Sequence, residues 1–151
     1  MRRAIRWACD EQRLTPDSIK YLPPAVRKPF EEYALTIAED MQYNQLKYFR
    51  PFEHQLKFFA TGAHERRGIL AANRIGKTVS TVIETAIHLT GQYPAWWPKT
   101  AKRWDKPVTV MVAGEGWQQV ALVLQAELLG TPDIKLTEMI GSGAIPRENI
   151  L

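Results

Sequence analysis

Apolar and polar residues follow each other along much of this chain with the period of an α-helix. Residues three or four apart share one helix face, so a recurring apolar stripe predicts a helix packed against a core. Such stripes predict helices over residues 30–45, 79–90 and 116–129, a shorter apolar helix around residues 56–59, and weak helical character over residues 1–22. The three long stripes consist of Phe30, Tyr33, Ala34, Ile37, Ala38 and Met41, of Val79, Val82, Ile83, Ala86 and Thr90, and of Trp117, Val120, Ala121, Leu124 and Leu128.

Two short apolar runs, residues 68–72 and 108–113, have no helical period. Continuous apolar runs of this length are typical of parallel strands buried on both faces. The order strand, helix, long loop, strand, helix predicts an α/β fold, in which right-handed crossovers place helices on both faces of a parallel sheet. The segment from Gly130 onward stays unassigned.

The octapeptide Ala71–Thr78 reads AANRIGKT and stands between the first expected strand and a helix. It fits the P-loop (Walker A) pattern with alanine in place of the first glycine, which predicts a site for ATP and Mg²⁺. Backbone N–H groups of the loop and of the helix N-terminus would face the phosphates. Gly76 would let the backbone approach, Lys77 would reach the β- and γ-phosphates, and the Thr78 hydroxyl would ligate Mg²⁺. The alternative is an ordinary turn in which Gly76 relieves crowding and Lys77 is solvated.

With this motif the expected fold becomes an incomplete P-loop NTPase sheet of the ASCE or RecA-like type, preceded by an N-terminal helical segment. The Pro-rich stretch around residues 23–29 suggests a boundary between a basic N-terminal arm, residues 1–29, and the ATPase part, residues 30–151. No convincing Walker B acid pair follows the loop, so the catalytic acid is not identified. Glu115 follows the second expected strand at the wrong spacing, and a role at a helix start fits it better.

Charge and cysteine content add little to this interpretation. The net charge of +4 lies entirely in residues 1–30, while residues 31–151 hold thirteen charges of each sign. A basic arm can bind phosphates or an acidic partner, or can be solvated without one. The single cysteine excludes an internal disulfide and favours a reduced, intracellular setting, and no apolar run approaches the length of a membrane span.

The P-loop and its flanks together resemble a known family. AANRIGKT is preceded by PFEHQLKFF and followed by TAIHLTGQYPAWW and VTVMVAGEGWQQVALVLQAELLG. Over roughly residues 30–151 this pattern resembles the N-terminal ATPase part of tailed-bacteriophage terminase large subunits, before the Walker B strand and the nuclease domain. The resemblance implies a motor that couples ATP hydrolysis to moving double-stranded DNA into a procapsid. It also implies the terminase small subunit and the portal as partners, a ring of copies at full length, and the cytoplasm of an infected bacterial host.

The resemblance assigns roles to individual positions as well. Ala72, Asn73, Arg74 and Ile75 would complete the phosphate loop, with Arg74 near the γ-phosphate as a stabiliser of transition-state charge. Phe52 and Gln55 resemble an adenine-recognition motif, since a Gln amide can pair with adenine N6 and N7 while a ring stacks on the base. The alternative is that Phe52 is a core aromatic residue and that Gln55 caps a helix.

Other functions stay open on the sequence alone. The chain could be a non-enzymatic phage or prophage product that acts through protein contacts, or another short P-loop NTPase such as a helicase-like protein or a kinase. Without a Walker B acid, we expect this chain by itself to hydrolyse ATP poorly. Residues 96–106 interleave four cations with three tryptophans, which suits either a DNA contact or a rigid loop with solvated lysines.

Overall fold

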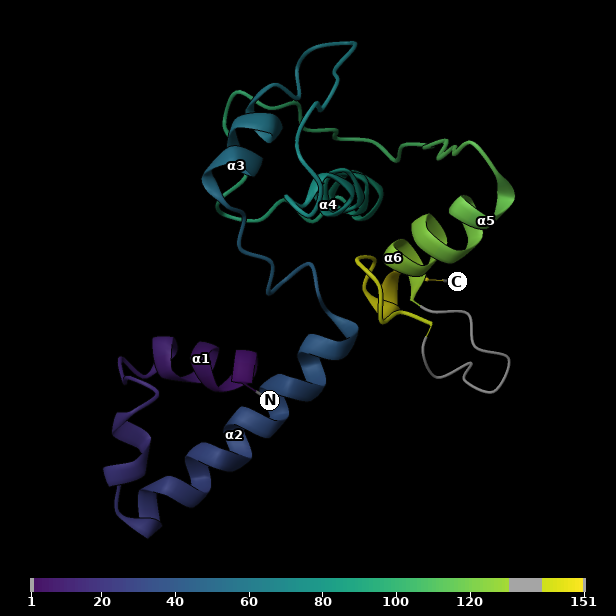
Figure 1. Ribbon diagram of the computed structural model, residues 1–151. Coiled ribbons are helices and arrows are strands. Elements are labelled where there is room, and N and C mark those ends of the chain that lie inside the picture. Colours follow the sequence, from purple (N-terminus) through teal and green to yellow (C-terminus); the bar gives the residue numbers. More distant parts are fainter. Residues whose placement is uncertain (1, 131–139, 151) are drawn as a thin grey trace. The chain divides into compact units, whose positions relative to one another are not determined.

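The computed structural model of the protein describes residues 2–130 and 140–150 (Figure 1). The chain divides into two compact units, Met1–Tyr43 and Asn44–Leu151. The division falls inside the region that the sequence analysis assigns to the ATPase part, and the functional boundary expected after residue 29 stays a prediction. Neither described range contains a helix long and apolar enough to cross a membrane.

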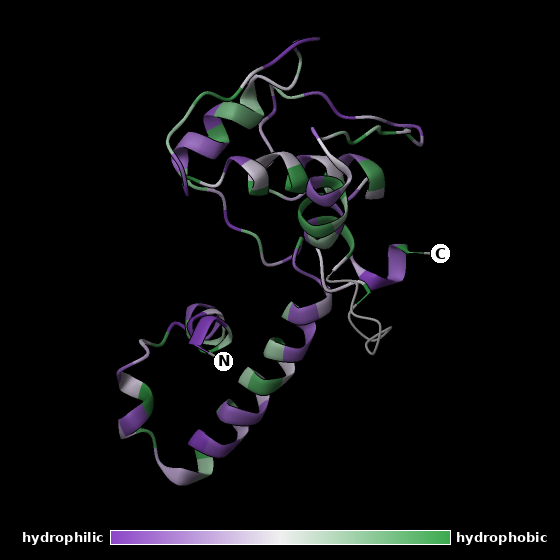
Figure 2. Ribbon diagram, turned by 45° about the vertical axis from the view of Figure 1, so that its right-hand side comes forward, coloured by the Kyte–Doolittle hydropathy of each residue, from purple (hydrophilic) through white to green (hydrophobic). Residues whose placement is uncertain are grey.

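The first unit is a helical hairpin. Helix α1 (Arg2–Glu11) leads through the 3-10 turn η1 (Ser18–Tyr21) into the long helix α2 (Pro24–Tyr43). Polar and apolar bands alternate along α2, the long helix near the N-terminus in Figure 2, and Phe30, Ala34 and Ile37 are its buried residues. The small buried residues of α1, Ala4, Ala8 and Cys9, allow the two helices to pack closely. Helix α2 begins six residues earlier than expected, with Pro24 at its first position, where proline is well tolerated, and it includes Pro29.

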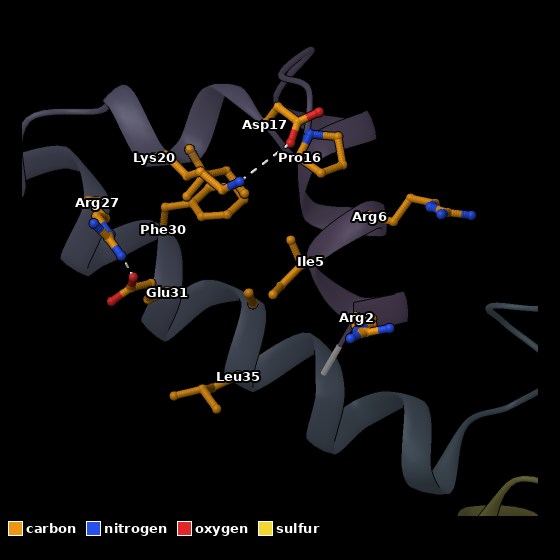
Figure 3. Close-up of a pocket in the computed structure, with 12 residues that line it drawn as sticks. Arg2, Ile5, Arg6, Pro16, Asp17, Lys20, Arg27, Phe30, Glu31 and Leu35 are labelled. Atoms are coloured by element: carbon orange, nitrogen blue, oxygen red, sulfur yellow. Dashed lines mark hydrogen bonds and ion pairs between the residues drawn. The ribbon is translucent and has the colours of Figure 1, made fainter.

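A cavity of about 970 Å³ lies between α1, η1 and α2 (Figure 3). Lys20 and Arg27 at its edge form ion pairs with Asp17, at 3.8 Å, and with Glu31, at 2.9 Å. Phe30 and Ile5 provide apolar walls. The lysine and one arginine of this cavity are thus already matched by carboxylates of the same unit.

The second unit is built around helix α4. Its elements are α3 (Glu53–Ala60), α4 (Lys77–Thr90), a continuous helical segment made of α5 (Trp117–Gln119), the π-helical turn η2 (Val120–Gln125) and α6 (Ala126–Leu129), and the 3-10 turn η4 (Arg147–Asn149). The buried face of α4 packs against Phe59 of α3, against Trp97 in the loop that follows α4, and against Leu128 of α6. The core residues of α4 are Val82, Ile83, Ala86 and Ile87. The helical stripes of the sequence are thereby confirmed as core faces for α2 and α4.

The expected sheet is absent from the described residues, which contain helices, turns and irregular segments but no strand. Residues 68–72 and 108–113 are irregular, and Leu70 and Met111 expose 102% and 92% of their surface. A strand exists only when its backbone N–H and C=O groups bond to a neighbouring strand, and neither segment has one here. Helix α4 packs instead on α3, on the loop around Trp97 and on α6. The prediction of an α/β P-loop NTPase sheet with helices on both faces is therefore wrong for this structure.

Candidate functional site

The AANRIGKT segment forms an irregular loop that turns directly into α4. Gly76 is the N-cap residue of α4, and its φ of 85° lies in the left-handed region that glycine adopts without a steric penalty. No side chain caps this end of the helix. The backbone N–H groups of the first turn, which have no partner inside a helix, and the positive end of the helix dipole therefore coincide at Lys77 and Thr78.

Lys77 closes the loop on itself. Its Nζ donates hydrogen bonds to the carbonyl oxygens of Ala71, at 2.8 Å, and Ala72, at 2.7 Å. An ammonium group has three donors, so one N–H is left for a further acceptor. The Lys77 ammonium group thus lies against the first two residues of the loop for which the sequence predicts phosphate binding.

The remaining loop residues are exposed to solvent. Asn73, Arg74 and Thr78 are exposed, and Arg74 has no hydrogen bond or ion pair with any described residue. The φ of Arg74 is 61°, a left-handed conformation that a residue with a Cβ adopts at a cost of about 1–2 kcal/mol. Its guanidinium group is free to meet an anion, and its predicted place near the γ-phosphate stays a prediction.

The Gln55 side chain links α3 to the start of α4. The side chain is 3% exposed; its Oε1 accepts the Phe52 N–H at 2.9 Å, and its Nε2 donates to Ser80 Oγ at 3.1 Å. Ser80 Oγ in turn donates to the Gly76 carbonyl at 2.8 Å. A chain of hydrogen bonds therefore runs from the start of α3 through Gln55 and Ser80 to the residue that begins α4.

His54 provides a second tie between α3 and the loop, since its Nε2 lies 3.0 Å from the Ile75 carbonyl oxygen. A cavity of about 190 Å³ lies between α3 and the loop, with Gln55, Ile75, Lys77 and Ser80 among its lining residues. The structure thus brings Gln55 together with the AANRIGKT loop, as the adenine hypothesis requires, although Gly76 follows Gln55 by 21 positions in the sequence.

The two sequence alternatives for Phe52 and Gln55 meet different outcomes. Gln55 does cap a helix, because its Oε1 accepts the N–H of Phe52, the N-cap residue of α3. Phe52 is not a core residue: it is 70% exposed, and its ring lies parallel to that of His54 with centroids 5.8 Å apart. An exposed ring beside the loop is available for stacking, so adenine recognition stays a prediction.

Ser80 and His54 are the site residues that the sequence analysis did not identify. Ser80 stands four residues after Gly76, one helical turn along α4, where a hydroxyl can reach back to the Gly76 carbonyl. A polar residue at this spacing from the loop glycine was the available signal for Ser80.

A buried ion pair lies one turn further along α4. Glu84 Oε1 accepts a hydrogen bond from Arg67 Nη2 at 2.8 Å and lies 3.8 Å from His88 Nε2. The His88 Nδ1 meets the Tyr93 hydroxyl at 3.0 Å. This network holds the segment before the AANRIGKT loop and the loop after α4 against the same helix, which gives His88 a structural role.

Glu115 lies next to the start of α5. It is exposed, and its N–H donates to Gln119 Oε1 at 3.2 Å.

No group of three or more His, Cys, Asp or Glu side chains converges as a metal centre within residues 2–130 and 140–150. The Thr78 hydroxyl is therefore the metal ligand that the sequence motif provides, and Mg²⁺ binding there stays a prediction.

Comparison with known proteins connects the chain to one curated protein. A stretch of 114 residues is 32% identical to the terminase large subunit of Salmonella phage P22, and it covers 68% of this chain and 22% of that protein. The chain thus spans about a fifth of the length of the relative it matches. No protein-family model matches the chain. No solved structure matches it either. The similarity supports the resemblance to terminase large subunits that the P-loop and its flanks suggested.

Proposed function

We propose that this chain is an ATP-binding part of a bacteriophage DNA-packaging motor related to terminase large subunits. The observation that carries the proposal is the start of α4, where the helix N-terminus has no side-chain cap, Lys77 Nζ bonds to the Ala71 and Ala72 carbonyls, and Thr78 is exposed in the first turn. The similarity to the phage P22 terminase large subunit gives this arrangement its context. The proposal concerns the loop and its surroundings and does not depend on a sheet.

Triphosphate binding follows from the chemistry of these groups. The free N–H groups of the first turn of α4 would donate to phosphate oxygens, and the helix dipole favours a negative charge at that end. The remaining N–H of Lys77 would reach a β- or γ-oxygen while its other two hold Ala71 and Ala72. Mg²⁺, held by the Thr78 hydroxyl and the phosphates, would neutralise part of the phosphate charge.

Arg74 and Phe52 would complete the site on its exposed side. The unpaired guanidinium of Arg74 would offset negative charge that develops on the γ-phosphate. The exposed ring of Phe52 would stack on the base. In the infected bacterial cell, the full motor would act on double-stranded DNA together with the small subunit and the portal, as a ring of copies.

The test is thermal stabilisation of the chain by ATP and Mg²⁺. A ligand present at about 100 times its Kd raises the free energy of unfolding by about 2.7 kcal/mol, which shifts the Tm by several degrees. We expect Lys77→Ala to abolish the shift. The matched control is Lys57→Ala, which removes a lysine of the same unit whose ion pair with Glu53 is exposed and should keep the full shift.

A second pair of variants isolates the metal. Thr78→Val should lose the additional stabilisation that Mg²⁺ brings over ATP in EDTA. Thr81→Val, three residues further along α4, should retain it, because Thr81 Oγ1 donates to the backbone carbonyls of Lys77 and Thr78 in its own helix. Equal shifts in the parent chain and Lys77→Ala would show that the loop does not bind phosphate.

A further inference from the structure

Four cations stand unpaired on one loop of the second unit. Residues 99–106, which we call the basic loop, contain one acid, Asp105, and four cations, Lys99, Lys102, Arg103 and Lys106. All four are exposed, and none forms an ion pair or a hydrogen bond with any described residue. The exposed cations of the first unit's cavity, Lys20 and Arg27, do form such pairs. The basic loop therefore carries a net charge of +3 that the described chain does not balance.

The backbone of the basic loop is anchored at both ends. On the N-terminal side, Trp97 and Ala101 are buried in the core, and Thr100 Oγ1 donates to the Ala60 carbonyl at 3.2 Å. On the C-terminal side, the Trp104 N–H donates to the Tyr93 hydroxyl at 2.8 Å. Because the loop is held before a partner arrives, ordering it on binding costs little conformational entropy.

Aromatic rings hold two of the cations in place. Lys102 Nζ lies 3.6 Å from the centre of the Trp104 ring, and Arg103 Cζ lies 5.4 Å from that of Tyr93. A cation–π contact orients a side chain but leaves its charge intact. The two side chains are thus restricted while both remain able to bind an anion.

We propose that the basic loop binds the phosphate backbone of duplex DNA, an inference that rests on the proposed function for the identity of the polyanion. A row of unpaired cations on an anchored loop suits phosphates, which attract Lys and Arg irrespective of sequence. Single-stranded DNA is bound largely by bases stacking on aromatic rings. The exposed ring of this loop, Trp104, is occupied by Lys102, which favours backbone contacts to a duplex.

The basic loop is also tied to the helix that carries the phosphate loop. The Tyr93 hydroxyl that accepts the Trp104 N–H lies 3.0 Å from His88 Nδ1 on α4. The first turn of the same helix carries Lys77 and Thr78. The proposed DNA contact and the proposed nucleotide contact thus lie at opposite ends of α4, joined through the His88–Tyr93 hydrogen bond.

The experiment is salt-dependent binding of a labelled 30-base-pair duplex to the full chain, followed by fluorescence anisotropy. Four phosphate contacts give a slope of log K against log salt of about −3.6, and removing three of them reduces its magnitude by about 2.7. The test variant combines Lys99→Gln, Lys102→Gln and Lys106→Gln. We expect its affinity at low salt to fall by at least about tenfold, with a flattened slope.

The matched control carries the same charge change elsewhere, as Lys20→Gln, Lys28→Gln and Lys57→Gln. It should bind duplex DNA within about twofold of the parent and keep the parent slope, because the proposal places the phosphate contacts on the basic loop. Equal losses in the two triple variants would overturn the proposal, because the loop would then contribute only bulk charge. Full affinity in the test variant would overturn it as well.

Two further measurements separate the proposals. Trp104→Leu removes the ring that orients Lys102, so we expect a small loss of duplex affinity with the parent salt slope kept. A strong preference of the parent for single strands that disappears in Trp104→Leu would overturn duplex binding. The test variant should retain the ATP-dependent thermal shift, and Lys77→Ala should retain DNA binding. If the parent shows no ATP shift but the lysine variants behave as expected, nucleotide binding fails while the DNA contact stands.

Discussion

Two glycines at the opposite ends of α4 allow backbone cost and crowding to be measured separately. Gly76 and Gly91 have similar left-handed conformations, with φ of 85° and 68°. Their surroundings differ, since a Cβ at Gly76 would lie 3.0 Å from Gln55 Nε2 and one at Gly91 would have no atom within 4 Å. Gly76→Ala therefore adds a steric contact to the conformational cost, and Gly91→Ala incurs the conformational cost alone.

The expected magnitudes follow from these surroundings. A left-handed conformation costs an L-residue about 1–2 kcal/mol. Alanine also restricts the unfolded chain, which offsets about 0.4–1 kcal/mol. Gly91→Ala should therefore lower the free energy of unfolding by about 1 kcal/mol. At Gly76 the neighbouring Gln55 amide is fixed by its bonds to Phe52 and Ser80, so crowding adds about 1–3 kcal/mol.

Urea unfolding followed by tryptophan fluorescence measures both costs, since four of the five tryptophans lie in the unit that contains α4. Combining Gly76→Ala with Gln55→Ala should recover the crowding part, because a shortened side chain leaves room for the new methyl group. Unchanged m-values would confirm that the unfolded states are comparable. A Gly76→Ala cost no larger than that of Gly91→Ala would refute the steric argument, and with it the close contact between α3 and the loop.

Substitutions at three other residues test Ser80 and Glu84 in the unit that contains α4 and Cys9 in the first unit. Ser80→Ala should lower the free energy of unfolding by about 1–3 kcal/mol in urea titrations, because Gln55 Nε2 loses its buried acceptor. Glu84→Ala should cost about 3 kcal/mol by leaving Arg67 partly buried without a carboxylate, and Glu84→Gln should cost less. Burial, and then the Asp10 carboxylate, raise the pKa of Cys9. The free energy of unfolding should therefore keep its full value below the thiol pKa of the unfolded chain and fall as the pH rises through the thiol pKa of the folded chain. Thermal melts of Cys9→Ala followed by circular dichroism should lack that part of the decline.

Helical periodicity predicted the elements whose stabilisation is local. An α-helix satisfies its own backbone, so an apolar stripe such as that of α4 needs only a surface to pack against. The runs at residues 68–72 and 108–113 carry equally apolar sequences but depend on a partner strand. Because nothing in an apolar run specifies its partner, Leu70 and Met111 were expected in a buried sheet and are exposed.

The residues of the candidate site were predicted where their spacing is local and missed where their contact depends on the packing of two helices. The motif located Gly76, Lys77 and Thr78 because their spacing reflects chemistry within one turn of chain. The contact between Gln55 and Ser80 depends on how α3 packs against α4, which no local pattern encodes. The helix-capping alternative for Gln55 was visible in the sequence because capping is also local.

The hydrogen bonds of Gln55 decide how base recognition could work at this site. To pair with adenine, its amide would have to exchange the Phe52 N–H and Ser80 Oγ for adenine N6 and N7, two bonds for two, with little net gain. Stacking on the exposed Phe52 ring requires no exchange of hydrogen bonds. We therefore expect Phe52→Ala to weaken ATP binding, measured by thermal shift, and Phe52→Trp to preserve it. If Phe52→Ala binds ATP as the parent does while Gln55→Ala loses the preference for ATP over GTP, recognition runs through the amide and the exchange argument is wrong.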